Sequence, residues 1–438
     1  MRGSYAIERV DEPSRCRAEI ELTSICNYEL APYCRRASLI GRRYRGHFGM
    51  QAREKMAWRL LKRLNDKPLV KDNPRSEAFY ALRYGTLKKF NNYLKLKRHY
   101  RAFDETVATY PYTLRIEPVN ACNLKCPLCP TGVGQIDRPR SVMSEAQYQS
   151  LLDELGDYLF FVRMYIWGEP LLNKRLWRLV TMTEERGIGS EISTNLSVPL
   201  TDQTIDRLIE ARLSWMIVSV DGATPETYRR YRRGGNLELV VANTRRIADR
   251  KRVLGIDTPY LEWQFIPMRH NEHEMDEIVR MGRDNGVDGV RFKPGRFDKT
   301  SEIAVAGTIM GPLIAQWKPT KTKIYHASEN TGAAYHDFHC PFLWGHAVVH
   351  ADGGIGSCCE SHLLEHDGGN LAKGSFVEQW NGPAFRRMRQ VAVGRTVDAH
   401  DDATPCANCT MFAKPFAQKG ADADVAGTPE ARLSTIGG

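Results

Sequence analysis

Residues 113–129 read TLRIEPVNACNLKCPLC, a strand-like segment followed at once by a loop with three cysteines. Cys122, Cys126 and Cys129 have the spacing C-x-x-x-C-x-x-C. Three thiolates in one loop can hold three irons of a [4Fe–4S] cluster and leave the fourth iron open to another ligand. Zinc is the alternative metal, but zinc loops usually combine two short pairs of Cys or His, and no histidine or fourth cysteine lies nearby in the sequence.

Strand-like and helix-like segments alternate from this loop onward. The strand-like segments are TLRIEPV (113–119), FVRMYIW (161–167), EISTNL (191–196), WMIVSVDG (215–222), YLEWQFIPM (260–268) and GVRFKP (289–294). Helices are predicted between them, near residues 144–156, 174–187, 202–212, 225–253 and 273–286. This alternation predicts an α/β fold with a parallel sheet and helical crossovers, built as an open or partial barrel. In such folds the active site lies at the carboxyl ends of the strands.

Motifs at these strand ends resemble, in order, those of the radical S-adenosylmethionine (SAM) superfamily. IEPVNACNLKCPLC is similar to the family's cluster loop, and Gly168-Glu169-Pro170 is similar to the motif that holds the amino group of SAM. Leu128 stands where the family often has an aromatic residue near the adenine. The resemblance implies further SAM contacts at the ends of the third, fourth and fifth strands, and the candidates are Ser193, Thr194, Asn195, Ser219, Asp221, Gln264 and Phe265. Pro170 and Gly222, taken singly, are also ordinary turn formers.

The resemblance implies a partial (β/α)6 TIM-like barrel and an enzyme that reductively cleaves SAM. The 5′-deoxyadenosyl radical formed in the family abstracts hydrogen from a substrate carbon. We expect a small or saccharide-like substrate from natural-product or glycan biosynthesis, because the N-terminal region shows helices and no helix-plus-hairpin pattern of a leader-binding module. The alternative is a peptide-modifying maturase that makes a thioether, a carbon–carbon cross-link or an epimer. An iron–sulfur or zinc binding module without SAM chemistry is the second alternative.

A second group of cysteines lies near the end of the chain. Cys340, Cys358, Cys406 and Cys409, with Gly353 and the segment GNLAKGSFVEQWNGPAFRRMR (369–389), resemble the SPASM extension of radical SAM enzymes or its shorter "twitch" form. The resemblance implies one auxiliary [4Fe–4S] cluster that transfers an electron, with Cys359 as a neighbour or alternative ligand. A zinc ribbon is the alternative for four cysteines that end in Cys-x-x-Cys.

The chain's positive charge is concentrated near its N-terminus. The net charge is +10, and residues 41–101 hold 18 Lys and Arg against 4 Asp and Glu. Apolar stripes predict helices at 50–65 (Met56, Leu60, Leu64) and 76–102 (Leu87, Phe90, Leu94), which we expect to dock on a larger domain. An acidic partner or an anionic membrane surface is the other expected contact, whereas nucleic-acid binding is not expected.

Several further features lead to expectations about compartment and partners. Eleven cysteines, with no signal-like segment and no run of about 18 apolar residues, predict a cytoplasmic metalloprotein without a membrane span. The segment IELTSICNYELAPYC (20–34) faintly repeats the cluster loop, but Cys16, Cys26 and Cys34 are expected to be ordinary thiols. A flavodoxin- or ferredoxin-like electron donor is implied by the family resemblance.

Two segments offer candidates without an assigned role. The run from Tyr228 to Gly235 is rich in arginine and forms either a surface helix face or a clamp for a phosphate or carboxylate. His270 and His273 follow the fifth strand. They are either acid/base groups or ordinary loop residues, so the sequence identifies no catalytic acid or base. The expected organisation is a basic, mainly helical extension (1–110), the barrel (111–297), a connector (298–338), the auxiliary-cluster domain (339–412) and a flexible tail (413–438).

Overall fold

The computed structural model describes residues 80–81, 83–293, 295, 316–320, 339–358, 361–395, 404–407 and 409. The predicted helix at 50–65, most of the connector, the tail, and Cys16, Cys26, Cys34 and Cys359 lie outside the described residues.

The described residues form one nine-stranded sheet with the strand order β6-β5-β4-β3-β2-β1-β7-β8-β9. Strands β1 to β7 pair in parallel, and β8 and β9 are antiparallel. The strands are β1 (Thr113–Ile116), β2 (Phe161–Met164), β3 (Gly189–Thr194), β4 (Trp215–Ser219), β5 (Tyr260–Phe265), β6 (Gly289–Phe292), β7 (His346–Val349), β8 (Gly354–Gly356) and β9 (Asp367–Asn370). The six predicted parallel strands and the open barrel are confirmed.

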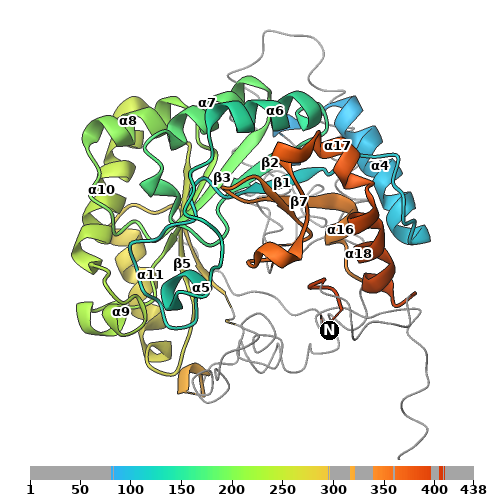
Figure 1. Cartoon of the computed structure of the whole chain (residues 1–438). Helices are drawn as coiled ribbons and strands as arrows, with labels where there is room; N and C mark the ends of the chain where they lie inside the picture. Colours follow the sequence, from blue (N-terminus) through green and yellow to red (C-terminus); the bar gives the residue numbers. More distant parts are fainter. Residues whose placement is uncertain are drawn as a thin grey trace, which may run out of the picture.

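Helices cover the outer face of this sheet (Figure 1). They are α6 (Glu145–Leu155), α7 (Leu176–Glu185), α8 (Asp202–Glu210), α9 (Pro225–Tyr231), α10 (Leu237–Leu254) and α11 (Met275–Asp284). The short helices α5 (Pro130–Val133), η1 (Pro170–Leu172) and η2 (Glu272–Glu274) belong to the connections after β1, β2 and β5. Leu114 and Ile116 of β1 belong to the apolar core. Arg115 alternates with them and faces the lumen of the barrel, because successive side chains of a strand point to opposite faces.

The segment 225–253, which was predicted as one long helix, forms the two helices α9 and α10. The prediction was therefore wrong at the break between them. The break follows α9, where Gly234 has φ of +85°. Gly235 then passes so close to Tyr228 that a Cβ would lie 2.7 Å from its ring. Asn236 begins α10 by accepting a hydrogen bond from the Leu239 N–H. The two glycines are therefore needed for a tight turn that the helical pattern concealed.

Helix α4 (Leu87–Ala102) packs against the barrel, but only one residue of the predicted stripe faces inward. Phe90 is buried as predicted, whereas Leu87 and Leu94 are 70% and 44% exposed. The Phe90 ring packs edge-on to Phe160, with centroids 5.1 Å apart. The predicted stripe left out Tyr93 and Leu96, which are both buried. None of the described helices is long and apolar enough to cross a membrane.

The C-terminal elements extend the barrel's own sheet. Strand β7 pairs in parallel with β1, in the register Thr113 to His346, and Figure 1 shows the C-terminal helices beside β1 and α4. These helices are α16 (Phe342–Gly345), η3 (Leu364–His366), η4 (Leu371–Lys373), α17 (Phe376–Trp380) and α18 (Pro383–Val393).

A buried arginine also joins the two parts of the chain. Arg138 follows the cluster loop, and its side chain is 1% exposed. Its guanidinium donates to the carboxylates of Asp352 (3.1 Å) and Asp367 (2.9 Å) and to the Leu363 carbonyl (2.9 Å). The cluster loop and the C-terminal strands are thus held by one side chain as well as by the sheet.

Candidate active site

The three-cysteine loop follows β1 at the carboxyl end of the sheet and packs on an apolar cluster of Leu124, Tyr231, Met268 and Trp317. Cys126 is buried in this cluster, and Cys122 and Cys129 are partly buried. The Lys125 N–H donates to the Arg233 carbonyl (2.9 Å), and the Cys129 N–H donates to the Cys126 carbonyl (3.2 Å). The first hydrogen bond therefore holds the loop against the residue two positions after α9, and the second closes a turn within the loop.

N–H groups point at two of the three sulfurs. Cys122 Sγ accepts from the Leu124 N–H at 3.4 Å and from Asn195 Nδ2 at 3.8 Å, and Cys126 Sγ accepts from Arg232 Nη1 at 3.9 Å. Burial raises the pKa of the Cys122 thiol to about 12 and raises that of Cys126. A bound iron would deprotonate both thiols, and N–H donors then stabilise the charge on the sulfurs.

The donor set suits an iron–sulfur cluster. Three cysteine thiols share one loop, and N–H groups are already directed at two of them. Among the residues that the structure describes, no three His, Cys, Asp or Glu side chains are close enough together to hold a single metal ion. The fit therefore rests on the chemistry of the thiols and their donors.

Glu169 ties the end of β2 to the end of β3. Its carboxylate accepts from Thr194 Oγ1 (2.6 Å), from the Asn195 N–H (2.7 Å) and from the Leu171 N–H (3.1 Å). Burial raises the pKa of this carboxyl group. A carboxylate has about four lone-pair sites, so these donors leave it little further capacity. Its predicted contact with the SAM amino group stays a prediction.

Gly168 allows the chain to pass against the cluster loop at this point. A Cβ at position 168 would lie 1.7 Å from the Val119 carbonyl oxygen, and the Glu169 N–H donates to the Ala121 carbonyl at 2.9 Å. No side chain fits there without a backbone shift.

We expect Gly168→Ala to weaken SAM binding at least about tenfold, which is about 1.4 kcal/mol, because the backbone shift that it forces displaces Glu169 and the cluster loop from each other. Equilibrium dialysis of anaerobically reconstituted protein with labelled SAM measures it. Gly187→Ala is the control, since a Cβ there meets no atom within 4 Å, although its φ of +63° adds some strain. Equal SAM affinity in wild type and Gly168→Ala would contradict the expectation.

Arg232 is a functional candidate that the sequence did not single out. Asp221 is fully buried and accepts from Arg232 Nε (2.6 Å) and Nη2 (2.5 Å) and from the Ile266 N–H (2.7 Å). Arg229, Arg230 and Arg233 are exposed, so only Arg232 of the basic run turns inward. Its spacing of four from the buried Tyr228 on α9 is the signal that identifies it. Asp221 holds Arg232 here, and its contact with SAM stays a prediction.

The remaining strand-end candidates divide between two places. Thr194 and Asn195 contact Glu169 at the rim, whereas Ser193 and Gln264 line a small pocket inside the barrel.

His270 packs edge-on to Trp317 at 5.1 Å, and burial lowers its pKa to about 4, with the Arg230 charge as a smaller cause. His273 is largely exposed.

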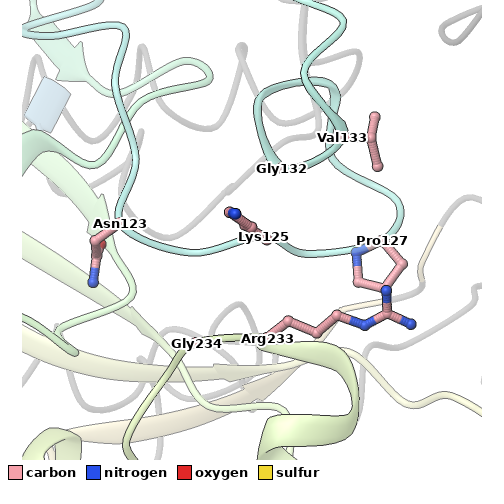
Figure 2. A pocket seen from close by; sticks show the side chains of 7 residues that line it. All are labelled: Asn123, Lys125, Pro127, Gly132, Val133, Arg233 and Gly234. Atoms are coloured by element: carbon pink, nitrogen blue, oxygen red, sulfur yellow. The ribbon is translucent and has the colours of Figure 1, made fainter.

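A groove of about 480 Å³ lies beside the cluster loop. Figure 2 shows Lys125 on the loop as one wall and Arg233 with Gly234, after α9, as the other. Both cations are exposed. This face of the loop is therefore open and positively charged.

The second cysteine group belongs to the C-terminal elements. Cys340 lies two residues before the start of α16, and Cys358 follows β8. Cys406 and Cys409 share a turn in which the Cys409 N–H donates to the Cys406 carbonyl at 3.4 Å. Cys406 is buried, and Cys340, Cys358 and Cys409 are partly buried.

Comparisons with known proteins match both parts of the chain. Residues 116–285 match the model of the radical SAM superfamily, and residues 340–410 match the SPASM iron–sulfur cluster-binding domain. The mycofactocin maturase MftC of Mycobacterium ulcerans is 30% identical over 326 residues, which are 70% of this chain and 84% of that protein. The GTP 3′,8-cyclase of Hydrogenovibrio crunogenus is 25% identical over 197 residues, 44% of this chain and 56% of that one.

Solved structures share the fold. Streptococcus suis SuiB bound to S-adenosylmethionine superposes with a TM-score of 0.51 at 15% identity and covers 83% of this chain and 87% of its own. SuiB bound to its precursor peptide SuiA gives the same TM-score at 14% identity, with 78% and 80% covered. At these identities the likeness establishes the fold alone.

Proposed function

The chain belongs to the radical SAM superfamily and carries a SPASM iron–sulfur domain, and from this premise we propose that it is a peptide-modifying maturase. The observation that carries the proposal is the similarity to mycofactocin maturase MftC over 70% of this chain. This observation favours the peptide alternative over the small or saccharide-like substrate expected from the sequence. The expectation of a small or saccharide-like substrate rested on the N-terminal helices, and residues 1–79 lie outside the described part of the chain.

The family membership implies [4Fe–4S] clusters and SAM binding. When bound, the cluster and SAM supply a 5′-deoxyadenosyl radical that abstracts hydrogen from a substrate carbon. We propose Cys122, Cys126 and Cys129 as ligands of the SAM cluster. Arg232 and Asn195 donate to two of these sulfurs and stabilise their charge. The proposed SAM contacts remain Leu128, Gly168, Glu169, Pro170, Ser193, Thr194, Asn195, Ser219, Asp221 and Gln264.

We propose a single auxiliary [4Fe–4S] cluster on Cys340, Cys358, Cys406 and Cys409. A cluster with four protein thiolates has no open iron for substrate, so electron transfer is the role that suits it. The pairing of β7 with β1 supports this role, because it joins the C-terminal elements to the strand that precedes the cluster loop.

An electron donor such as a flavodoxin or ferredoxin stays a prediction, as does a cytoplasmic location. The groove in Figure 2 supports the electron donor, because Lys125 and Arg233 form a cationic surface on the cluster loop. Positive side chains favour the approach of an acidic protein and speed its association at low salt.

The test supplies the anaerobically reconstituted protein with SAM, a reductant and a short peptide encoded beside its gene. We expect the peptide to raise 5′-deoxyadenosine formation at least about tenfold, which is about 1.4 kcal/mol of barrier. Mass spectrometry then reads the product: a cross-link loses hydrogen, and an epimer formed in heavy water takes up deuterium. Stimulation by sugar nucleotides, and by no such peptide, would overturn the proposal.

A further inference from the structure

A buried glutamate and a buried histidine stand side by side where β1 and β7 end. Ile116 pairs with Val349 in the parallel ladder, and the Glu117 N–H donates to the Val349 carbonyl at 2.9 Å. Glu117 Oε2 then lies 3.3 Å from His350 Nδ1, and these two side chains are 2% and 0% exposed. Because a carboxylate only accepts hydrogen bonds, Nδ1 carries the proton and donates it. The C-terminal elements therefore supply a donor to a carboxylate of the barrel.

The position of His350 is fixed by the turn between β7 and β8. Its N–H donates to the Gly354 carbonyl at 2.8 Å, and its carbonyl accepts from the Gly353 N–H at 3.0 Å. The ring lies against β8, since a Cβ at Gly356 would be 3.3 Å from His350 Nε2. A side chain that is already held in this way makes its hydrogen bond to Glu117 at little cost in entropy.

The other oxygen of Glu117 holds the segment that leads into the proposed SAM contacts. Glu117 Oε1 accepts from the Trp167 N–H at 3.2 Å, and Trp167 immediately precedes Gly168-Glu169. The Trp167 carbonyl accepts from Thr131 Oγ1 of α5 at 2.9 Å. The N–H and the carbonyl of Trp167 are thus both held, one by β1 and the other by the helix that follows the cluster loop.

The C-terminal elements also meet the side chain of Trp167. Its ring packs edge-on to the buried His362, with centroids 5.8 Å apart, which is within the usual range for such pairs. Trp167 is therefore contacted by the C-terminal elements twice, directly by His362 and through Glu117 by His350.

Loss of the His350 donor changes what Glu117 can hold. A buried carboxylate oxygen without a hydrogen-bond partner is costly, so the carboxyl group takes up a proton or turns towards water. Either change weakens its hold on the Trp167 N–H. Because a Cβ at Gly168 would already lie 1.7 Å from the Val119 carbonyl oxygen, the backbone here has no slack, and a shift of Trp167 passes on to Gly168-Glu169.

We propose that His350 is a positioning residue for SAM binding, which acts through Glu117 and Trp167 on Gly168-Glu169. The inference rests on the proposed SAM contacts of that segment, and not on the proposed peptide substrate. It gives the SPASM domain a role besides electron transfer, because the barrel needs this domain to hold its SAM-binding segment. None of the contacts named above involves a cysteine of the second group, so this role depends on the turn after β7 and not on the auxiliary cluster.

The first test compares His350→Leu with His350→Asn in the full-length, anaerobically reconstituted protein. Leucine removes the donor, whereas asparagine keeps an N–H donor near the place of Nδ1. We expect His350→Leu to raise the Kd for SAM at least about tenfold in equilibrium dialysis, and His350→Asn to recover most of the affinity. At saturating SAM, 5′-deoxyadenosine formation should stay within about twofold of wild type, because lost positioning affects binding more than the chemical step.

His346→Leu is the matched control, because His346 makes the same kind of link at the other end of the same two strands. Its Nε2 lies 3.0 Å from the Tyr112 hydroxyl, and the residue is 4% exposed. Four residues of strand, about 13 Å, separate it from His350. We expect His346→Leu to lower the midpoint of urea unfolding and to leave the Kd for SAM as in wild type.

The second test separates positioning from stability. Glu117→Met/His350→Leu replaces both buried polar partners by apolar side chains, which restores stability because no buried group is left unpaired. The Trp167 N–H still lacks its acceptor, so we expect the Kd for SAM to stay raised. This double variant carries the test if His350→Leu alone does not fold.

The third test needs neither SAM nor the cluster. Hydrogen exchange is followed by mass spectrometry in the peptide that contains residues 165–172. We expect exchange in His350→Leu to be at least about tenfold faster than in wild type and in His346→Leu, because the Trp167 N–H opens more often.

Three outcomes would overturn the inference. They are equal exchange in wild type and His350→Leu, SAM affinity that returns in the double variant, and unchanged SAM affinity in His350→Leu while Gly168→Ala weakens SAM binding. The last outcome leaves the proposed SAM contacts in place. If Gly168→Ala also binds SAM as wild type does, the proposed SAM contacts themselves fail, and this inference fails with them.

Discussion

Cys122→Ala/Cys126→Ala/Cys129→Ala protein will lose SAM cleavage and retain about four of about eight irons, as expected when one of two four-iron clusters is removed. The thiols are the only cysteines of the loop after β1, so no neighbouring sulfur in the loop replaces them. We expect the fall in 5′-deoxyadenosine formation to exceed the roughly 10–100-fold effect of losing a group that merely supports a metal ligand. Iron analysis and chromatography of 5′-deoxyadenosine, both anaerobic, measure the two effects.

The matched control removes the other group of cysteines. A Cys340→Ala/Cys358→Ala/Cys406→Ala/Cys409→Ala variant should also retain about four irons, yet should still cleave SAM, because its cluster loop is intact. Cleavage that survives the triple substitution would contradict the assignment of the loop, as would zinc in place of iron.

Replacement of Arg138 will cause a large loss of stability. Arg138→Met leaves the carboxylates of Asp352 and Asp367, which are 9% and 13% exposed, without the guanidinium that they share. Breaking a buried ion pair by removing one partner costs about 3–5 kcal/mol. We expect the apparent midpoint of urea unfolding, followed by fluorescence, to fall accordingly.

Arg140→Met is the control for this substitution. Arg140 lies two residues further on and is exposed, so its replacement should change the free energy of unfolding by about 0.5 kcal/mol or less. Equal unfolding midpoints for the two variants would contradict the expectation that the buried ion pairs of Arg138 stabilise the fold. A triple variant with Asp352→Asn and Asp367→Asn should recover part of the loss, because the buried charges are then removed together.

The six parallel strands of the barrel and the place of the cluster loop could be predicted because they depend on local patterns. Each buried strand is a short apolar run, and C-x-x-x-C-x-x-C is read directly from adjacent residues. The break at Gly234 could not be read this way, since two helices in succession have the same period as one long helix. The buried face of α4 was also misjudged, because Tyr93 is apolar over most of its surface and polar only at its tip.

The inward turn of Arg232 and the cations of the lumen depend on contacts between separate segments. Arg232 is one of several arginines in its run, and its partner is Asp221, which follows β4 and lies eleven residues before it in the sequence. Arg115 and Arg291 lie more than 170 residues apart and meet only because both strands face one lumen. Single-residue patterns carry no information on such pairs.

The pairing of β7 with β1 has a consequence for biosynthesis. Thr113 pairs with Phe161 of β2 on one side, but on the other side its partner His346 leaves the ribosome about 230 residues after Thr113 itself was made. At a translation rate of about 5–20 residues per second, this edge of β1 stays unpaired for roughly 10–50 s. An unpaired strand edge is a template for pairing with another chain. The nascent protein therefore passes through a period in which this edge of β1 is open to another chain, and we expect slower translation of residues 117–345 to lower the soluble yield.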